Sequence, residues 1–192
     1  MEFKRTCIFG YKATWKRSNG SIVAENCLQS EPSWMYDHRD VIKVLKIKDV
    51  VLPGSHDSGS YTKSGDLYSI FAGSVFTQEE NFLSQLIWGV RFFDIRPAIL
   101  RTSFPIIDQN APKFWISHSV FPTHWMQTVV DDTKTFLKNT REIIVWEIIN
   151  FSVIPGGGRW LSEDFKMFME YLKQEFNDWL VKPGSLSWDK VK

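Results

Sequence analysis

The spacing of hydrophobic and polar positions changes several times along the chain, and each change predicts a new element. Residues 6–28 alternate around Asn19-Gly20, which predicts two antiparallel strands joined by a two-residue turn. An almost unbroken apolar run at 143–149 is typical of a strand buried on both faces. The predicted strands after the hairpin are 47–52, 90–95, 114–116 and 143–149.

Between these strands, apolar residues recur at steps of three and four, which is the period of an amphipathic helix. The predicted helices are 33–45 capped by Ser33, 77–88 with the capping-box sequence of Thr77 to Glu80, 123–138, and 162–180 capped by Ser162. Gly89 is expected to end the second helix, and Gly156-Gly157-Gly158 is expected to be a flexible turn after the last strand. Alternating strands and helices predict parallel βα units and therefore an α/β fold.

Composition narrows the class of protein. The chain has 192 residues, which is enough for one domain with a core and fewer than the roughly 250 of a complete eight-unit βα barrel. Lys and Arg (23) nearly balance Asp and Glu (22), which argues against a nucleic-acid binder. No apolar run approaches the roughly 20 residues of a membrane span, and residues 1–10 carry charges where a signal peptide would be apolar. We expect a soluble chain; the compartment stays open, the cytoplasm included.

The two cysteines are predicted to be reduced thiols. If Asn19-Gly20 forms the turn, Cys27 lies opposite Lys12, five residues from Cys7. Five residues of a strand span about 17 Å, which a disulfide cannot bridge.

Charged and imidazole side chains follow the first three predicted strands after the hairpin. His56 and Asp57 come after the first, Asp94 and Arg96 stand at the end of the second, and His118 follows the third. In a parallel barrel the carboxyl ends of all strands point to one face, so these groups should converge. Two histidines and an arginine suit cleavage of a phosphodiester, with one base, one acid and a cation for the phosphate.

Several longer motifs in the same order resemble the X domain of phosphatidylinositol-specific phospholipase C. They are Leu52-Pro53-Gly54-Ser55-His56-Asp57-Ser58, Gln85 followed by Gly89 to Arg96, His118 before a helix, and Arg141 to Val145. The resemblance is strongest to small X-domain proteins of animals and to the related bacterial enzymes. It covers about 34–192 and implies a partial TIM-type (β/α) barrel with about four of eight βα units, preceded by a β-hairpin. The implied division is a hairpin segment, 1–32, compatible with the end of a preceding β domain, and the N-terminal half of the X domain, 33–192.

The resemblance also implies a role for each candidate residue. His56 would be the general base for the inositol 2-hydroxyl, and His118 the general acid for the diacylglycerol oxygen. Asp57 would orient His118, Arg96 would bind the phosphate, and Asp94 would support Arg96 or the substrate. The implied activity is that of a phosphoric diester hydrolase of lipid metabolism, acting on a phosphoinositide or another phosphodiester lipid and using no cofactor. Arg96 stands where calcium-dependent members carry an acid, which implies the metal-independent branch.

Two other functions stay open. The half barrel leaves His56 without the acid that steadies it in the bacterial relatives, so the chain could be a catalytically incompetent or lipid-binding remnant that aggregates or dimerises in isolation. A metal-dependent phosphodiesterase would instead bind a cation through His56, Asp57 and Asp94, although Arg96 would repel that cation.

Some of these residues also have a structural interpretation that is simpler than the catalytic one. His56-Asp57 fits an ordinary turn, and Asp94 with Arg96 fits a structural ion pair. His38 and His124 are expected to be surface or capping residues. Phe121 and Trp125 lie near the predicted mouth of the site, where they could enter a lipid surface. The sequences Asn19-Gly20-Ser21 and Asn150-Phe151-Ser152 match the glycosylation acceptor pattern, which is common by chance.

Overall fold

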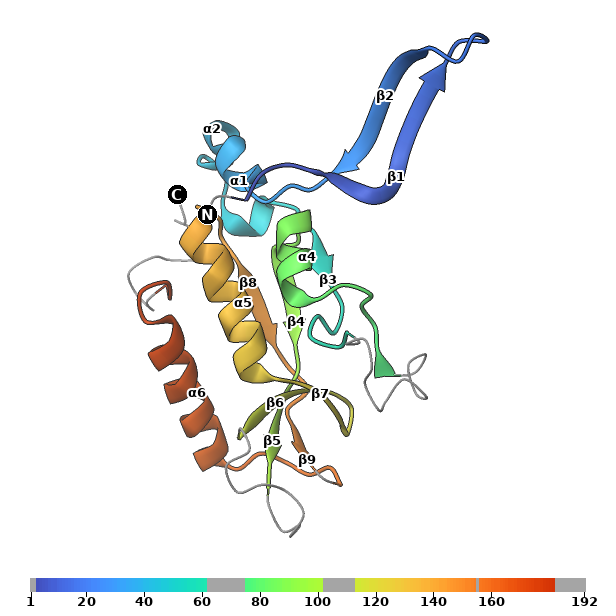
Figure 1. The fold of residues 1–192 in the computed structure, drawn as a ribbon. Coiled ribbons are helices and arrows are strands. Elements are labelled where there is room, and N and C mark those ends of the chain that lie inside the picture. Colours follow the sequence, from blue (N-terminus) through green and yellow to red (C-terminus); the bar gives the residue numbers. More distant parts are fainter. Residues whose placement is uncertain (1–2, 62–74, 102–112, 155, 182–192) are drawn as a thin grey trace.

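The computed structural model describes residues 3–61, 75–101, 113–154 and 156–181, which form a mixed α/β fold with a projecting arm (Figure 1). Its elements, in chain order, are β1 (Cys7–Lys16), β2 (Ile22–Gln29), α1 (Trp34–Asp37), α2 (Arg39–Ile42), the 3-10 turn η1 (Ile47–Asp49), β3 (Gly54–Ser55), α4 (Phe82–Trp88), β4 (Phe92–Ile95), β5 (Pro97–Leu100), β6 (Phe114–His118), β7 (Phe121–Trp125), α5 (Met126–Asn139), β8 (Val145–Ile148), β9 (Ser152–Ile154) and α6 (Ser162–Phe176).

Two small sheets lie end to end in the body of the molecule. β3, β4 and β8 form a parallel sheet in the order β3-β4-β8, and β5 to β7 with β9 form a mixed sheet in the order β7-β6-β5-β9. Only Arg96 separates β4 from β5, and both β4/β8 and β5/β9 pair in parallel. Two long chain segments therefore pass from the first sheet into the second, and no closed barrel forms among the described strands.

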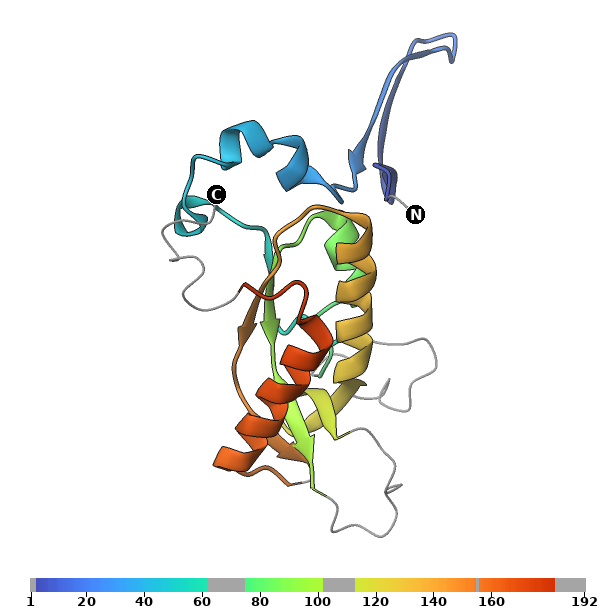
Figure 2. The same ribbon diagram turned by 90° about the vertical axis from the view of Figure 1, so that its left-hand side faces the viewer.

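Helices α5 and α6 cover one side of these sheets, as Figures 1 and 2 both show. Their buried side chains recur at helical spacing, with Met126, Val129, Val130 and Phe136 on α5 and Phe168, Leu172 and Phe176 on α6. They join Phe93, Ile95 and Ile116 of the strands in one hydrophobic core. No helix among the described residues is long and apolar enough to cross a membrane.

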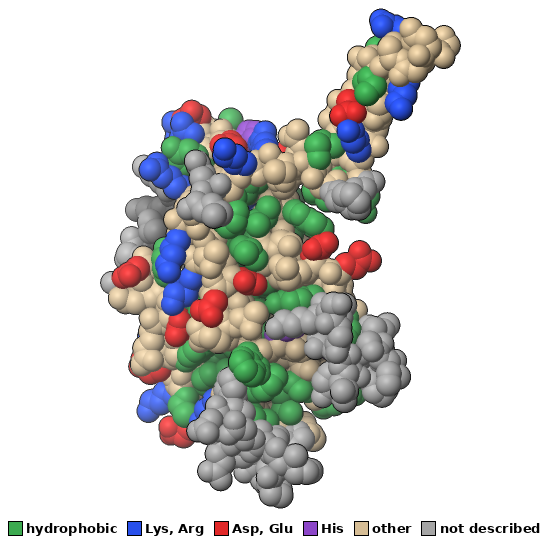
Figure 3. Space-filling view, viewed as in Figure 1, with side chains coloured by type: hydrophobic (Ala, Val, Ile, Leu, Met, Phe, Trp, Pro, Cys, Tyr) green, Lys and Arg blue, Asp and Glu red, His purple; other side chains and the backbone are tan. Residues whose placement is uncertain are grey.

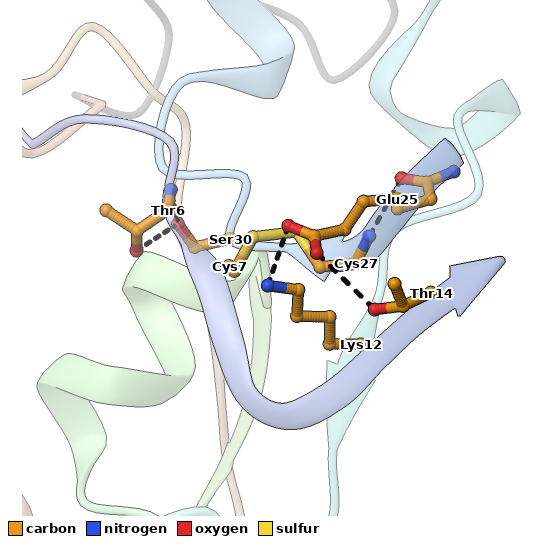
Figure 4. The surroundings of a disulfide bond; sticks show 8 residues. Thr6, Cys7, Lys12, Thr14, Glu25, Cys27 and Ser30 are labelled. Atoms are coloured by element: carbon orange, nitrogen blue, oxygen red, sulfur yellow. Dashed lines mark hydrogen bonds and ion pairs between the residues drawn. A yellow bond between two sulfur atoms is a disulfide. The ribbon is translucent and has the colours of Figure 1, made fainter. Parts of the chain in front are cut away.

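β1 and β2 form the arm, which stands clear of the body in the space-filling view (Figure 3). The predicted turn and the pairing of Lys12 with Cys27 are confirmed, but the prediction of reduced thiols is wrong, because Cys7 and Cys27 form a disulfide. Beyond Lys12 the strand β1 bulges, so that Cys7 lies opposite Gln29 and its Cα is 5.5 Å from that of Cys27 (Figure 4). A regular register cannot anticipate such a bulge.

Several predicted boundaries shift. The segment 47–52 is not a strand and contains the 3-10 turn η1. Pairing with β4 begins only after it: the Pro53 carbonyl accepts from the N–H groups of Arg91 and Phe92, and Gly54 is the first residue of β3. The helix predicted at 77–88 begins at Phe82, where the Asn81 side chain caps Ser84 N–H at 2.8 Å. Gly89 ends it as predicted, with φ +111°. The helix predicted at 33–45 divides at His38 into α1 and α2.

Three further expectations concern the sheets and the last helices. The strand at 114–116 exists as β6, but it runs antiparallel to β5, and residues 123–125 belong to β7. The run at 143–149 contains β8, which is not buried on both faces as predicted: Val145, Trp146 and Ile148 are half-buried and Glu147 is exposed, because β8 lies at the edge of its sheet. Ser162 is the first residue of α6, where Asp164 accepts from the Leu161 N–H at 2.7 Å.

Candidate active site

His56 and Asp57 follow β3 directly and are held by backbone contacts. The Asp57 N–H donates to Asp94 Oδ2 at 3.0 Å, and the Ser58 N–H donates to the Asp94 carbonyl at 2.9 Å. The Gln78 side-chain amide donates to the His56 carbonyl at 2.6 Å. Asp57 adopts a left-handed backbone (φ 47°), which aspartate tolerates better than most residues. This turn buries Asp57 completely and leaves the His56 side chain 68% exposed.

Asp94 and Arg96 stand where β4 passes into β5, on the same side of the chain. Arg96 Nη2 lies 2.7 Å from Asp94 Oδ2, and Arg96 Nε donates to both Asp94 oxygens at 3.1 Å. Arg96 Nη1 lies 3.2 Å from Asp57 Oδ2. The guanidinium therefore sits between the two carboxylates, and the expected ion pair of Asp94 with Arg96 is present.

His118 reaches the same place from the opposite direction. β6 runs antiparallel to β5, so its carboxyl end returns to the junction of β4 and β5, where Ser117 N–H donates to the Arg96 carbonyl at 3.0 Å. His118 Nε2 lies 3.7 Å from Asp57 Oδ2. The predicted convergence is present, but parallel strands explain it only for β3 and β4.

The carboxyl groups of the two aspartates experience different surroundings. Burial raises the pKa of Asp57 above its usual value, although Arg96, His118 and Ser60 oppose the shift. Burial also acts to raise the pKa of Asp94, but the hydrogen bonds from Arg96 and from the Asp57 N–H outweigh it, and the pKa is lowered. The hydrogen bond to Asp94 in turn raises the pKa of Arg96, so this guanidinium stays charged.

His56 has an acid neighbour that sequence reasoning did not find. Its Nδ1 lies 3.2 Å from Asp94 Oδ2, whereas the sequence left it without a candidate acid. Arg96 Nη2 lies 3.3 Å from Nδ1 and 3.4 Å from Nε2 of the same ring. Because these two nitrogens flank Cε1, an atom nearly equidistant from both lies along neither lone pair. Arg96 Nη2 therefore contacts the ring between its two nitrogens.

A pocket of about 450 Å³ opens beside Arg96 and His118. Its other lining residues are Ser119, Val120, Asn150, Phe151, Ser152, Gly157 and Gly158. Among the described residues, the non-glycine residues with positive φ are Asp57, Ser119 and Asn150, all of them at this site. Sequence reasoning did not select Ser119 or Asn150 as residues of this site; their position shortly after a predicted strand was the available signal. Glycines at positive φ form one wall, as expected for the predicted turn.

The remaining candidates lie elsewhere or differ from expectation. His38 is exposed, as predicted, but His124 is buried, stacks on Tyr61 with ring centroids 3.9 Å apart, and contacts the Tyr61 carbonyl at 2.7 Å through Nε2. β7 carries it inward because it pairs with Ile116 of β6. Phe121 is 38% exposed beside His118, its partner across the β6–β7 pair. Within the described ranges no group of three His, Cys, Asp or Glu side chains is arranged to hold a metal ion.

The relatives of the chain are phospholipases and X-domain proteins. No family model matches it. A PI-PLC X domain-containing protein of Dictyostelium discoideum is 34% identical over 121 residues, which are 56% of this chain and 20% of the relative. A 1-phosphatidylinositol phosphodiesterase of Staphylococcus aureus is 40% identical over 77 residues, which are 40% of this chain and 23% of the relative.

Solved structures give the same picture. The phosphatidylinositol-specific phospholipase C of S. aureus superposes with a TM-score of 0.58 at 26% identity, covering 82% of this chain and 47% of that one. The Listeria monocytogenes enzyme, at 20% identity and a TM-score of 0.57, supports the fold alone. These similarities support a relationship of the chain to the PI-PLC X-domain family. It spans about a fifth of the length of the Dictyostelium relatives and about half of the solved enzymes.

Proposed function

We propose that the site cleaves the phosphodiester bond of a phosphatidylinositol-type lipid, which would make the chain part of a phospholipase C-like phosphoric diester hydrolase. One observation carries the proposal: His56, Arg96 and His118, from three separate segments, meet around Asp57 and Asp94 at distances of 2.7–3.7 Å. A general base, a general acid and a fixed cation within reach of one phosphorus atom are what such a reaction needs.

His56 is the proposed general base. We infer that Asp94 Oδ2, 3.2 Å from Nδ1, holds the proton on that nitrogen, which leaves Nε2 to accept the proton of the inositol 2-hydroxyl. The freed oxygen attacks phosphorus and closes a cyclic inositol phosphate. The exposure of His56 fits this role, because the hydroxyl arrives from solvent with the lipid head group.

His118 is the proposed general acid. The carboxylate of Asp57, 3.7 Å from Nε2, orients the ring. As the bond from phosphorus to the glycerol oxygen breaks, His118 gives its proton to that oxygen and diacylglycerol leaves. Water can then open the cyclic product with the two histidines in exchanged roles.

Arg96 supplies the fixed positive charge for a phosphodiester. Its guanidinium lies between the carboxylates of Asp57 and Asp94, which hold it in place. Arg96 keeps its charge at every physiological pH and offers its remaining N–H groups to the phosphoryl oxygens. Asp94 acts as the support of Arg96. Because this cation lies between the two carboxylates, we propose that the reaction needs no metal ion.

We infer that residues 33–192 form the N-terminal half of the X domain, with a partial TIM-type barrel, and that 1–32 is a separate hairpin segment. The parallel order β3-β4-β8 and the 47% coverage of the S. aureus enzyme support this division. The second candidate is a catalytically incompetent or lipid-binding remnant of the family. The observation that favours it is the apolar surface left uncovered between the edge strand β8 and its neighbouring helices.

The test is turnover of phosphatidylinositol in mixed micelles. We expect His56→Ala and His118→Ala each to lower turnover by about 10²–10⁴-fold, since each removes one proton transfer. Arg96→Ala should also be inactive, and chelator should leave wild-type turnover unchanged. His38→Ala, an exposed histidine on α1–α2, is the matched control and should keep the wild-type rate. Wild-type rates in the His56 and His118 variants would overturn the mechanism, and lipid binding without turnover would establish the remnant.

We also propose a peripheral membrane contact beside the site. Val120 and Phe121, in and after the β6–β7 turn, are 42% and 38% exposed next to His118, where the glycerol would leave. Phe121→Ser should weaken binding to phosphatidylinositol vesicles in a sedimentation assay. Trp88→Ser, which removes an aromatic ring of equal exposure at the end of α4, should not. Equal losses in both variants would contradict the assignment, and Trp125, 50% exposed at the far end of β7, would then be tested in the same way.

A further inference from the structure

We propose that Asn19, at the tip of the arm, is the acceptor of an N-linked glycan. The sequence Asn19-Gly20-Ser21 matches the acceptor pattern, which by itself proves little. Its place in the fold adds the information that the pattern lacks. The tripeptide forms the turn between β1 and β2, as far from the body as the arm extends (Figures 1 and 3).

The turn orients the Asn19 side-chain amide through hydrogen bonds to its oxygen. Asn19 Oδ1 accepts from the Ser21 N–H at 3.0 Å and from the Ser21 hydroxyl at 2.7 Å. Both contacts occupy the oxygen, and no hydrogen bond from Nδ2 is present among the described residues. Gly20 has φ +81° and open space around the position of a Cβ, so nothing in the body crowds the turn. The nitrogen of the amide is therefore the exposed end of the side chain.

The reaction is transfer of an oligosaccharide from a lipid-linked pyrophosphate donor. Asn19 Nδ2 forms the bond to the anomeric carbon and loses one proton, the bond from that carbon to the pyrophosphate oxygen breaks, and the lipid pyrophosphate leaves. No oxidant or reductant takes part. The hydrogen bonds from Ser21 hold the amide by its oxygen and so orient Nδ2 away from the turn.

The disulfide of the arm is the second, independent observation. Cys7 and Cys27 are joined at the base of the same hairpin. Disulfides form and persist in oxidising compartments and are rare in the cytosol. In eukaryotic cells that compartment is also where N-linked glycans are attached to exposed loops of secreted chains. The arm thus has an acceptor sequence in an exposed turn and a disulfide, and both features fit the oxidising compartment in which N-linked glycans are attached.

The second acceptor pattern supplies an internal contrast. Asn150 lines the pocket beside Arg96 and His118, and the Ser152 hydroxyl is hydrogen-bonded to the Ser117 hydroxyl at 2.8 Å. A glycan on Asn150 would fill that pocket, whereas a glycan on Asn19 projects into solvent. Asn150 is therefore the position to compare with Asn19, since both share the pattern and only one is at an open turn.

The experiment expresses the full chain behind a cleavable secretory leader in animal cells and analyses the secreted protein by intact mass with and without a glycan-removing amidase. We expect a glycan on wild type and on Asn150→Gln, and none on Asn19→Gln or Ser21→Ala. Ser21→Thr keeps the hydroxyl and should keep the glycan. Non-reducing peptide mapping of the same sample identifies the Cys7–Cys27 pair.

The outcomes are decisive in either direction. A secreted chain with the disulfide formed and Asn19 unmodified would overturn the proposal. It would also be overturned if the glycan persisted in Asn19→Gln, because the acceptor would then be another residue. Loss of the glycan in both Asn19→Gln and Ser21→Ala, with retention in Ser21→Thr, would establish Asn19 as the acceptor.

Discussion

Asp57 and Asp94 share one guanidinium, yet their surroundings shift the two pKa values in opposite directions. Asp57 is fully buried and Arg96 Nη1, at 3.2 Å, compensates it only in part, so burial raises its pKa. Asp94 accepts hydrogen bonds from Arg96 and from the Asp57 N–H, which lower its pKa. The first carboxylate thus costs folding free energy, and the second contributes to it.

This difference predicts opposite effects of two similar substitutions. Below both its folded pKa and its unfolded pKa of about 3.9, an aspartate is protonated in both states. As pH rises, the depressed folded pKa of Asp94 adds stability, and the raised folded pKa of Asp57 removes it. At pH 7, Asp94→Asn should therefore lower the free energy of unfolding by about 1–3 kcal/mol, whereas Asp57→Asn should leave it unchanged or raise it.

Thermal melts of both variants and wild type between pH 3 and pH 8 provide the measurement. The difference between wild type and Asp94→Asn should vanish as the pH falls through the folded pKa of Asp94. Both variants should lose the proposed phosphodiesterase activity, which separates stability from function. A larger loss of stability in Asp57→Asn than in Asp94→Asn at pH 7 would contradict the assignment of the pKa directions.

The sequence predicted which residues come together at this site better than it predicted the contacts between them. His56, Asp57, Asp94, Arg96 and His118 were all selected because they stand at strand ends, and all five converge. The contact of Asp94 with His56 was missed, because the spacing of residues along a chain does not show which side chains meet across a junction. Their catalytic roles stay predictions.

At the scale of elements, a buried ion pair joins four segments at the end of the molecule away from the site. Arg91 and Glu142 have no exposed side-chain surface, and their charged groups lie 2.8 Å apart. Glu142 accepts from the N–H groups of Met35 and Tyr36 at the start of α1. Arg91 donates to carbonyl oxygens of Leu86 and Val90 at the end of α4, and of Glu31 and Pro32 after the arm. The pair thus fixes the arm to the body.

We expect Glu142→Gln to destabilise the fold by about 3–5 kcal/mol, because it leaves the Arg91 guanidinium buried without a counter-charge. The midpoint of urea unfolding measures the effect, because urea is uncharged and does not screen ion pairs. Asp40→Asn, which breaks the exposed pair with Lys43, is the control and should barely move the midpoint. A midpoint for Glu142→Gln equal to that of the control would show that the pair contributes no more than a surface contact.

Element types were predictable where periodicity was strong and failed where tertiary contacts decided. The period of α5 and α6 identified both helices, and the Asn19-Gly20 turn identified the arm. The bulge in β1 was not predicted, although the apolar run Cys7-Ile8-Phe9 and Gly10 interrupt the alternation there. That single irregularity reversed the prediction for the cysteines. Thr77 resembled a helix cap, yet its hydroxyl instead donates to the carbonyls of His56 and Asp57.

At the scale of the whole molecule, one apolar surface lies uncovered beside the edge of the parallel sheet. A groove of about 270 Å³ runs between α5, β8 and the end of α6. Its apolar lining residues are Leu137, Ile144, Trp146, Ile148, Met169, Leu172, Phe176, Trp179 and Leu180. β8 pairs with β4 on one side only among the described strands, so its other edge carries unpaired backbone groups next to the groove.

A free strand edge beside an apolar groove predicts self-association of the 192-residue chain. A parallel edge and an apolar groove together match the two surfaces that a further βα unit would cover. Without such a unit, a second copy is the available partner, and sedimentation velocity at rising concentration should show dimers or larger species. Met169→Lys, which places a charge on a half-exposed groove residue, should reduce this association without lowering the melting temperature.

The matched control is Val51→Lys, which places the same charge on a residue that is 93% exposed outside the groove. It should associate as wild type does, because a lysine there removes no contact between copies. Equal association in Met169→Lys and wild type would mean that copies meet through another surface, such as the free edges of the arm. A concentration-independent monomer with a cooperative melt would mean that the chain tolerates the uncovered groove and that its fold is stable without a second copy.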